Sequence, residues 1–153
     1  MRECGDCTAC CTKVLIVPNY TENDGVYCEH CEIKKGCKIY KTRPEMCVDF
    51  ECLWYKQEQI PDEYRPDKIG VMFENPAGTL IYFGTVDPAK KDLWKKNYKV
   101  GIMVKKIKES GHPVFIEGNA FLPEGMSKET FSEMLKECQQ IYRGVDDKWQ
   151  LQQ

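Results

Sequence analysis

The chain has 153 residues, 42% of them hydrophobic, and a formal net charge of −2 at pH 7. It is long enough to bury a core, and the nearly balanced charge argues against a general nucleic-acid binder, which needs a clear basic excess. No stretch approaches the roughly 20 apolar residues of a membrane helix, and the N-terminus does not have the pattern of an export signal. We therefore expect a cytoplasmic protein that forms one compact domain.

Residues 1–58 have few signals of regular structure apart from one predicted short strand. That strand, residues 12–18 (TKVLIVP), is apolar, rich in β-branched residues and closed by a proline. Turns are predicted at residues 20–25 and around Gly36, and Pro44 is placed to begin a helical turn. We therefore expect an irregular N-terminal lobe.

Residues 59–153 have the patterns of a small unit that mixes strands and helices. Residues 59–67 contain two prolines and predict the connection from the first lobe. Residues 68–74 (KIGVMFE) and 79–86 (TLIYFGTV) predict two strands separated by the turn sequence NPAG. Together they predict a β-hairpin.

A helix is predicted from Pro88 or Ala89 to about Glu109, with Ser110 and Gly111 as its stop. Residues that recur at steps of three and four form the apolar side of this helix. These residues are Leu93, Asn97, Val100, Val104 and Ile107. We expect this side to pack on the sheet.

A third strand is predicted at residues 112–118, followed by a helix that Ser127 caps and that has Glu129 in its first turn. The apolar side of that helix consists of Phe131, Met134, Leu135, Cys138 and Ile141. The tail from about Asp146 is expected to fray. The fold class is therefore α+β: an irregular cysteine-rich lobe followed by a small β-β-α-β-α portion packed on it.

Cysteine is the outlying residue type, with ten in the chain. Nine lie in the first third: Cys4, Cys7, Cys10, Cys11, Cys28, Cys31, Cys37, Cys47 and Cys52. Because a reducing cytoplasm disfavours disulfides, such a group indicates metal thiolates more than cross-links or inert buried thiols. We expect the lobe to bind metal through these nine residues.

Spacing supports the metal interpretation, because two cysteines separated by two residues can reach one metal ion from a single turn. The chain has this spacing in Cys4/Cys7, Cys7/Cys10 and Cys28/Cys31. One zinc ion or one iron–sulfur cluster takes about four protein ligands, so nine thiols exceed a single site. Either two metal centres share the lobe, or one centre leaves thiols for other tasks. The tight triplet favours iron–sulfur over zinc.

Three other residues are of types that occur in metal or catalytic sites. His30 lies inside CEHC and is a possible replacement ligand, although a side chain between two ligands often points away from the metal. His112 has no acidic or thiol neighbour in sequence, so we expect a structural role. Cys138 is expected to pack in the core, as free cysteines on apolar helix faces do.

Three stretches in order, CGDCTACC, YCEHC and GCKIYKTRPEMCVDFEC, resemble the YkgJ-type cysteine-cluster family, described as a zinc- or iron-chelating domain with a CxxCxxCC signature. The resemblance covers about residues 4–52. It implies metal ligands at Cys4, Cys7, Cys10, Cys11, Cys31, Cys37, Cys47 and Cys52. Cys28 is an addition to the family pattern. The resemblance implies metal binding but no particular reaction.

Several functions are compatible with such a lobe. The leading hypothesis is a binding or electron-transfer module that holds an iron–sulfur cluster, zinc or both, presented to a protein partner by the α+β part. The alternatives are a zinc-only structural module that serves protein interaction, and a metal-dependent oxidoreductase. A thiol enzyme that uses a spare cysteine is a weaker alternative, because no Cys/His/Asp set is evident. No catalytic residue is assigned, and no specific nucleic acid or membrane partner is predicted.

Overall fold

The computed structural model describes residues 2–11, 27–76, 79–91 and 93–142. The strand predicted at residues 12–18, the turn predicted at 20–25 and the tail from Asp146 lie outside these residues. In the first third of the chain the elements are short. They are η1 (Ala9–Cys11), β1 (Cys31–Glu32), β2 (Gly36–Cys37), η2 (Tyr40–Thr42), α1 (Glu45–Asp49) and α2 (Leu53–Lys56).

The rest of the chain contains the longer elements. Two short helices, η3 (Asp62–Tyr64) and α3 (Pro66–Ile69), occupy the predicted connection. They are followed by β3 (Val71–Glu74), β4 (Tyr82–Val86), η4 (Pro88–Lys90), η5 (Trp94–Lys96), α4 (Tyr98–Glu109), β5 (Val114–Ile116), β6 (Asn119–Phe121) and α5 (Lys128–Tyr142). The α+β fold class is thus confirmed.

The main sheet has the strand order β3-β4-β5-β6. β3 and β4 pair antiparallel, which confirms the predicted hairpin, and β4 and β5 pair parallel through the crossover that contains α4. β6 pairs antiparallel with β5 and was not predicted. It follows the turn at Glu117 and Gly118, both of which have positive φ, so the chain reverses directly after β5.

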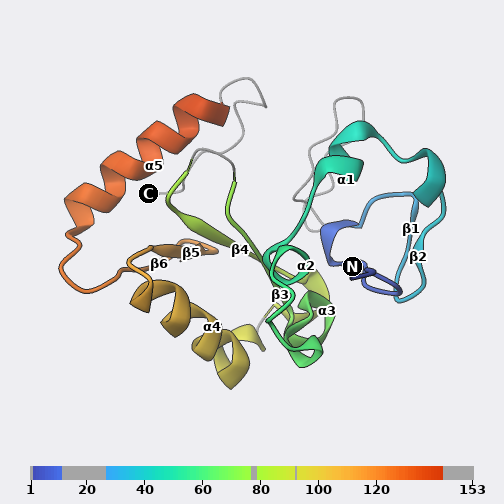
Figure 1. The fold of residues 1–153 in the computed structure, drawn as a ribbon, viewed down its shortest axis with the longest axis horizontal. Coiled ribbons are helices and arrows are strands. Elements are labelled where there is room, and N and C mark those ends of the chain that lie inside the picture. Colours follow the sequence, from blue (N-terminus) through green and yellow to red (C-terminus); the bar gives the residue numbers. More distant parts are fainter. Residues whose placement is uncertain (1, 12–26, 77–78, 92, 143–153) are drawn as a thin grey trace.

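Two helices cover opposite faces of this sheet (Figure 1). Because side chains alternate along a strand, Val114 and Ile116 of β5 pack in the core that contains α4, whereas Phe115 packs on the other side beside Phe131 of α5. Close packing explains Gly84 in β4, where a Cβ atom would come within 2.7 Å of the Ile116 side chain. The sheet therefore forms the middle layer of the second half of the chain.

The helix predicted from Pro88 or Ala89 begins only at Tyr98, so the predicted start was wrong. The side chain of Asn97 accepts a hydrogen bond of 3.0 Å from the Lys99 backbone N–H and caps α4. Before this cap, η4 and η5 direct Trp94 into the core and leave Leu93 62% exposed. Leu93 is therefore not part of the apolar helix side.

The predicted start of the last helix is confirmed. The Ser127 hydroxyl accepts a hydrogen bond of 3.0 Å from the Thr130 backbone N–H, one of the donors that the first turn leaves unpaired. Phe131 and Cys138 are buried in a second hydrophobic cluster with Ile81 of the sheet. Cys138 is thus a core residue, as its helix position predicted.

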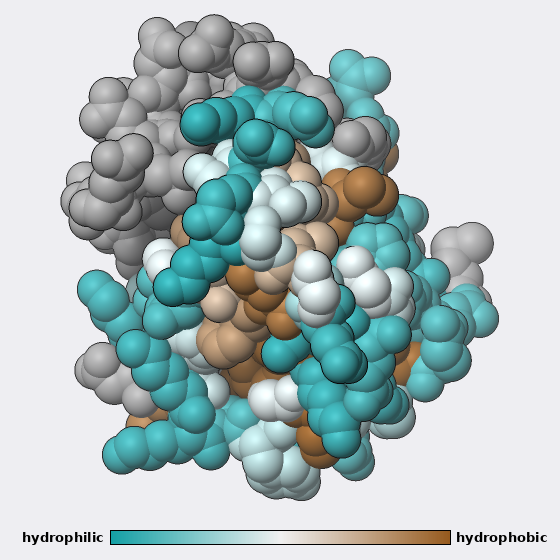
Figure 2. All heavy atoms as spheres, turned by 90° about the vertical axis from the view of Figure 1, so that its left-hand side faces the viewer, coloured by the Kyte–Doolittle hydropathy of each residue, from teal (hydrophilic) through white to brown (hydrophobic). Residues whose placement is uncertain are grey.

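The two ends of the molecule differ in character. The cysteine-bearing segments and α1 gather beyond the β3 edge of the sheet, on the side opposite to α5 (Figure 1). The α5 side presents a central hydrophobic band between hydrophilic outer surfaces (Figure 2). None of the described helices has the length and apolar character that crossing a membrane requires.

Candidate metal centre

The first cysteine segment is held by tight backbone turns. The backbone N–H of Cys7 donates to the carbonyl of Cys4 (3.0 Å), and that of Cys11 donates to the carbonyl of Thr8 (3.0 Å). Such turns bring the two side chains of a CxxC unit to one side. The backbone N–H of Cys28 then donates to the Cys11 carbonyl (2.7 Å), so the second cysteine segment lies directly against the first.

The remaining cysteines come from four short elements or their ends. Cys31 lies in β1 and is the direct partner of Cys37 in β2. Lys34 and Gly36, both with positive φ, form the turn between these strands, as predicted around Gly36. Cys47 lies in α1, which begins directly after Pro44. Cys52 is the residue that caps α2.

Three thiols are joined by direct hydrogen bonds. Cys11 hydrogen bonds with both Cys10 and Cys31, and the buried Thr8 hydroxyl also hydrogen bonds with Cys31. The hydrogen bond from Cys11 lowers the pKa of Cys10 to about 7, with help from Arg43 and against burial. Cys10 is therefore the thiol that most readily ionises near neutral pH.

Arg43 supplies positive charge to several thiols of this group. Its guanidinium lies 3.9 Å from the centre of the Tyr40 ring and donates to the carbonyls of Tyr40 (2.7 Å) and Cys47 (3.3 Å). Burial raises the pKa of Cys4 and of Cys47, and Arg43 acts against that rise in both. The RPxxC sequence thus places a fixed cation beside three thiols, Cys10 included.

The Cys7 side chain interacts with a residue of α3, which lies outside the cysteine segments. Burial raises its pKa to about 12, and it hydrogen bonds with the Asp67 side chain of α3. Arg65 holds that carboxylate at 2.6 Å and also contacts Asp6 at 2.7 Å. Although burial opposes it, the Arg65 hydrogen bonds lower the pKa of Asp67. The sequence analysis did not identify this Arg65–Asp67 pair. Its one signal in the sequence is the motif RPD.

Cys52 lies where the lobe meets the main core. Burial raises its pKa to about 11, while the backbone N–H groups of Tyr55 and Trp54 at the start of α2 act to lower it. Leu53 and Trp54 follow directly and are buried in the core. Among the described residues, the buried indole N–H of Trp54 has no hydrogen-bond partner. Cys52 therefore connects the cysteine group with the hydrophobic core.

The structure gathers all nine predicted ligands in one lobe, Cys28 included, because each interacts electrostatically or pairs with another of them. All ten cysteines are free thiols. Across the described ranges, no three or more Cys, His, Asp or Glu side chains are arranged so that they could hold a metal ion. The thiols thus share a neighbourhood without forming a coordination sphere.

The two histidines have different surroundings. The Nε2 atom of His30 lies 3.7 Å from the Glu29 carboxylate. His112 packs edge-on against Tyr82 with ring centres 5.5 Å apart.

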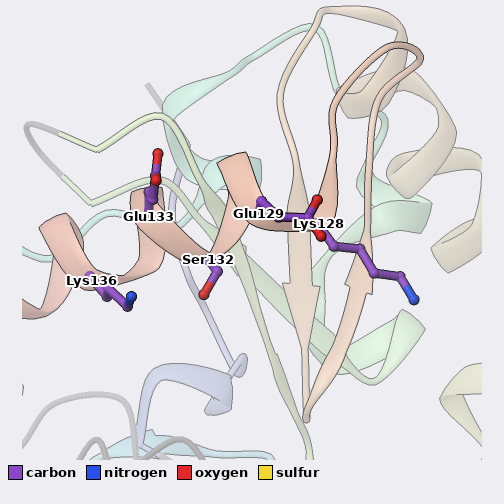
Figure 3. A pocket seen from close by; sticks show the side chains of 5 residues that line it. All are labelled: Lys128, Glu129, Ser132, Glu133 and Lys136. Atoms are coloured by element: carbon purple, nitrogen blue, oxygen red, sulfur yellow. The ribbon is translucent and has the colours of Figure 1, made fainter.

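A hollow along the outer side of α5 offers no second centre (Figure 3). It is lined by Lys128, Glu129, Ser132, Glu133 and Lys136. These side chains leave the helix in different directions and do not converge. Because two lysines accompany two glutamates, their charges balance, as on an ordinary solvated helix surface.

No family model, curated protein or solved structure matches the chain. The likeness to the YkgJ-type family therefore depends on the quoted sequence motifs.

Proposed function

We propose that the chain is a metal-binding protein of the YkgJ-like kind, acting as a binding or electron-transfer module in the cytoplasm. Its lobe, residues 1–58, would hold an iron–sulfur cluster, zinc or both. The ligands would come from Cys4, Cys7, Cys10, Cys11, Cys28, Cys31, Cys37, Cys47 and Cys52. Residues 59–153 would form the platform on which this lobe is presented to a protein partner.

One observation carries the proposal: thiols from separate segments are all influenced by the positive charge of Arg43. The charge of Arg43 acts to lower the pKa of Cys4, Cys10 and Cys47, although these residues come from a loop, η1 and α1. Bringing thiols together costs free energy once they ionise, because like charges repel. A fixed guanidinium offsets part of this repulsion. An arrangement of this kind is suited to holding several thiolates at once.

Cysteine thiolates are suitable ligands for zinc and for an iron–sulfur cluster. Soft thiolate ligands select zinc and iron–sulfur clusters over hard cations such as magnesium. When bound, a cluster supplies one-electron chemistry, whereas zinc supplies structure alone. The protein's own residues would orient the ligands: Asp67 through its hydrogen bond to Cys7, Thr8 through Cys31, and the start of α2 through Cys52.

A zinc-only structural module is the second candidate. The β1–β2 hairpin favours it, because CxxC pairs and a short hairpin with a further cysteine are typical of zinc-bound turns. A metal-dependent oxidoreductase would need a substrate site beside the thiols. No catalytic residue is assigned to it.

The full chain purified without oxygen tests the proposal. We expect metal in stoichiometric amounts, with brown colour, absorption near about 400 nm and acid-labile sulfide for iron–sulfur, or colourless zinc-loaded protein for the second candidate. Reversible reduction of the centre would support electron transfer. Metal-free folded protein from metal-supplemented, oxygen-free preparations would contradict both candidates.

A matched pair of variants locates the centre. Cys47→Ser removes a thiol in the lobe and should lower bound metal, whereas Cys138→Ser changes a thiol of α5 that is buried beside Ile81 of the sheet and should leave the metal content unchanged. Equal metal in wild type and Cys47→Ser would remove Cys47 from the ligand set.

A further inference from the structure

A cleft of about 420 Å³ lies between α4 and the chain that follows α2. Its floor is apolar and consists of Leu53, Ile60, Met103 and Ile107. All four side chains are buried in the same hydrophobic core, so the floor is fixed by packing. This volume falls within the usual range of small-molecule sites, about 300–1,000 Å³.

The wall opposite α4 is also held in place. The guanidinium of Arg2 donates to the backbone carbonyls of Trp54, Gln57, Glu58 and Ile60. Gln57 and Ile60 belong to the cleft lining. Because one cation holds several carbonyls of this loop, the wall keeps its shape without a ligand, which lowers the entropy cost of binding.

Among the described residues that line the cleft, Lys106 provides a positive charge. Lys106 and His112 lie on the α4 side, and the described lining residues include no aspartate or glutamate. His112 is fixed by a contact of 3.1 Å between its Nδ1 atom and the Ser110 hydroxyl, and by its edge-on packing on Tyr82. A bound molecule therefore meets cationic or hydrogen-bonding groups above an apolar floor.

The acidic residues next to lining residues of the opposite wall in sequence, Glu58, Asp62 and Glu63, do not themselves line the cleft. Asp62 lies 3.9 Å from Arg2, and Glu63 lies 3.6 Å from Lys99. Neither residue lines the cleft, although their neighbours Pro61 and Tyr64 do. In a chain whose net charge is −2, this local absence of lining carboxylates favours an anion.

We propose that this cleft binds a small organic anion with an apolar, preferably aromatic, body. The body would lie on the Met103 and Ile107 floor, where thioether and ring contacts are favourable. Its anionic group would face Lys106 and His112. This site is separate from the proposed metal centre, and its test does not depend on the metal.

The test compares two fluorescent probes on the full chain as purified. They are 1-anilinonaphthalene-8-sulfonate and its uncharged analogue N-phenyl-1-naphthylamine. We expect the sulfonate to bind about fivefold more tightly, as a partly exposed ion pair allows. Lys106→Gln should abolish this difference and leave the neutral probe unaffected. Lys105→Gln, a matched control on the same helix that pairs with Glu109 outside the cleft, should preserve it.

Proton NMR locates the probe independently of affinity. Nuclear Overhauser effects from the bound sulfonate to the Met103 methyl group and the His112 ring are expected. A thermal midpoint equal to that of the wild type shows that each variant is folded. Equal binding of the two probes, equal losses in Lys105→Gln and Lys106→Gln, no binding up to about 1 mM probe, or contacts only elsewhere would overturn the proposal.

Discussion

At the scale of single residues, neighbouring cysteines in the lobe have very different acidities. Cys10 and Cys7 are three positions apart, yet the pKa of Cys10 is lowered to about 7 while burial raises that of Cys7 to about 12. The difference follows from their partners, because Cys10 has Cys11 and Arg43 beside it, whereas Cys7 is buried near the carboxylate of Asp67. Equal sequence spacing therefore does not mean equal chemistry.

This difference predicts the alkylation pattern of the metal-free protein. Since thiolates react and thiols do not, Cys10 should be labelled by iodoacetamide with half its maximal rate near about pH 7, while Cys7 stays unreactive there. Mass spectrometry of labelled peptides at a series of pH values measures this. Equal rates for the two residues at neutral pH would contradict the assignment.

Arg43→Gln tests the electrostatic cause. Removing a cation destabilises the thiolate, so the Cys10 profile should move to higher pH, by up to about one unit. Lys41→Gln, an exposed neighbour, is the control and should leave the profile in place. The same labelling experiment measures both variants, and an unmoved profile in Arg43→Gln would show that hydrogen bonding, without Arg43, lowers the pKa of Cys10.

At the scale of elements, the sequence pattern predicted long helices and strands well and short capped turns poorly. The β3–β4 hairpin and α5 were predicted because their apolar residues follow one clear period and Ser127 is a strong cap. The start of α4 was misplaced because Leu93 fits the helical spacing, although the Asn97 cap at 3.0 Å begins the helix four residues later. β6 was missed because three residues are too few to show a period.

The start of α4 at Tyr98 leads to a prediction about the stability of the protein. Trp94→Ala should lower the free energy of unfolding by about 3–5 kcal/mol, because Trp94 is 4% exposed in the core. Leu93→Ala should change it by less than about 0.5 kcal/mol, since Leu93 is 62% exposed. Urea unfolding followed by circular dichroism measures both. A larger loss for Leu93→Ala than for Trp94→Ala would contradict a helix start at Tyr98 and would support the helix predicted from Pro88 or Ala89.

The short helix α2 depends on a residue far from it in sequence. Arg2, with a side chain only 14% exposed, donates to Trp54 and to three carbonyls after the helix, and its guanidinium lies 4.4 Å from the centre of the Trp54 ring. A charged hydrogen-bond donor contributes about 1.5–3 kcal/mol in such a site. We expect Arg2→Ala to lower the thermal midpoint by about 6 °C.

Arg2→Lys is the matched control for this prediction. Lysine keeps the charge but not the planar fork that reaches several carbonyls at once, so it should recover only part of the loss. Differential scanning calorimetry of the two variants measures the difference. Full recovery by lysine would mean that charge alone, and not the shared hydrogen bonds, stabilises this loop.

At the scale of the whole molecule, the buried hydrophobic residues are distributed unevenly. Within the described residues, every member of the two hydrophobic clusters comes from Leu53 or later. The buried residue of the earlier part is Thr8, a polar one. In the sequence, cysteine density likewise falls where apolar periodicity begins. The sequence pattern could not predict the contacts between these two parts of the chain. One such contact is the 2.6 Å hydrogen bond from the Tyr27 hydroxyl to the Asp87 carboxylate, which joins side chains 60 positions apart.

Because the described residues before Leu53 add no buried member to either hydrophobic cluster, this part of the chain needs another source of folding free energy, and under the proposed function metal binding supplies it. Removing the metal with a chelator should therefore abolish amide hydrogen-exchange protection in residues 2–11 and 27–50, while α4 and β5 stay protected by the packing of Val100, Val104 and Val114. Exchange followed by mass spectrometry measures the two regions in one sample. Uniform loss of protection would show that the lobe and the sheet unfold as one unit, and unchanged protection would show that the lobe folds without metal.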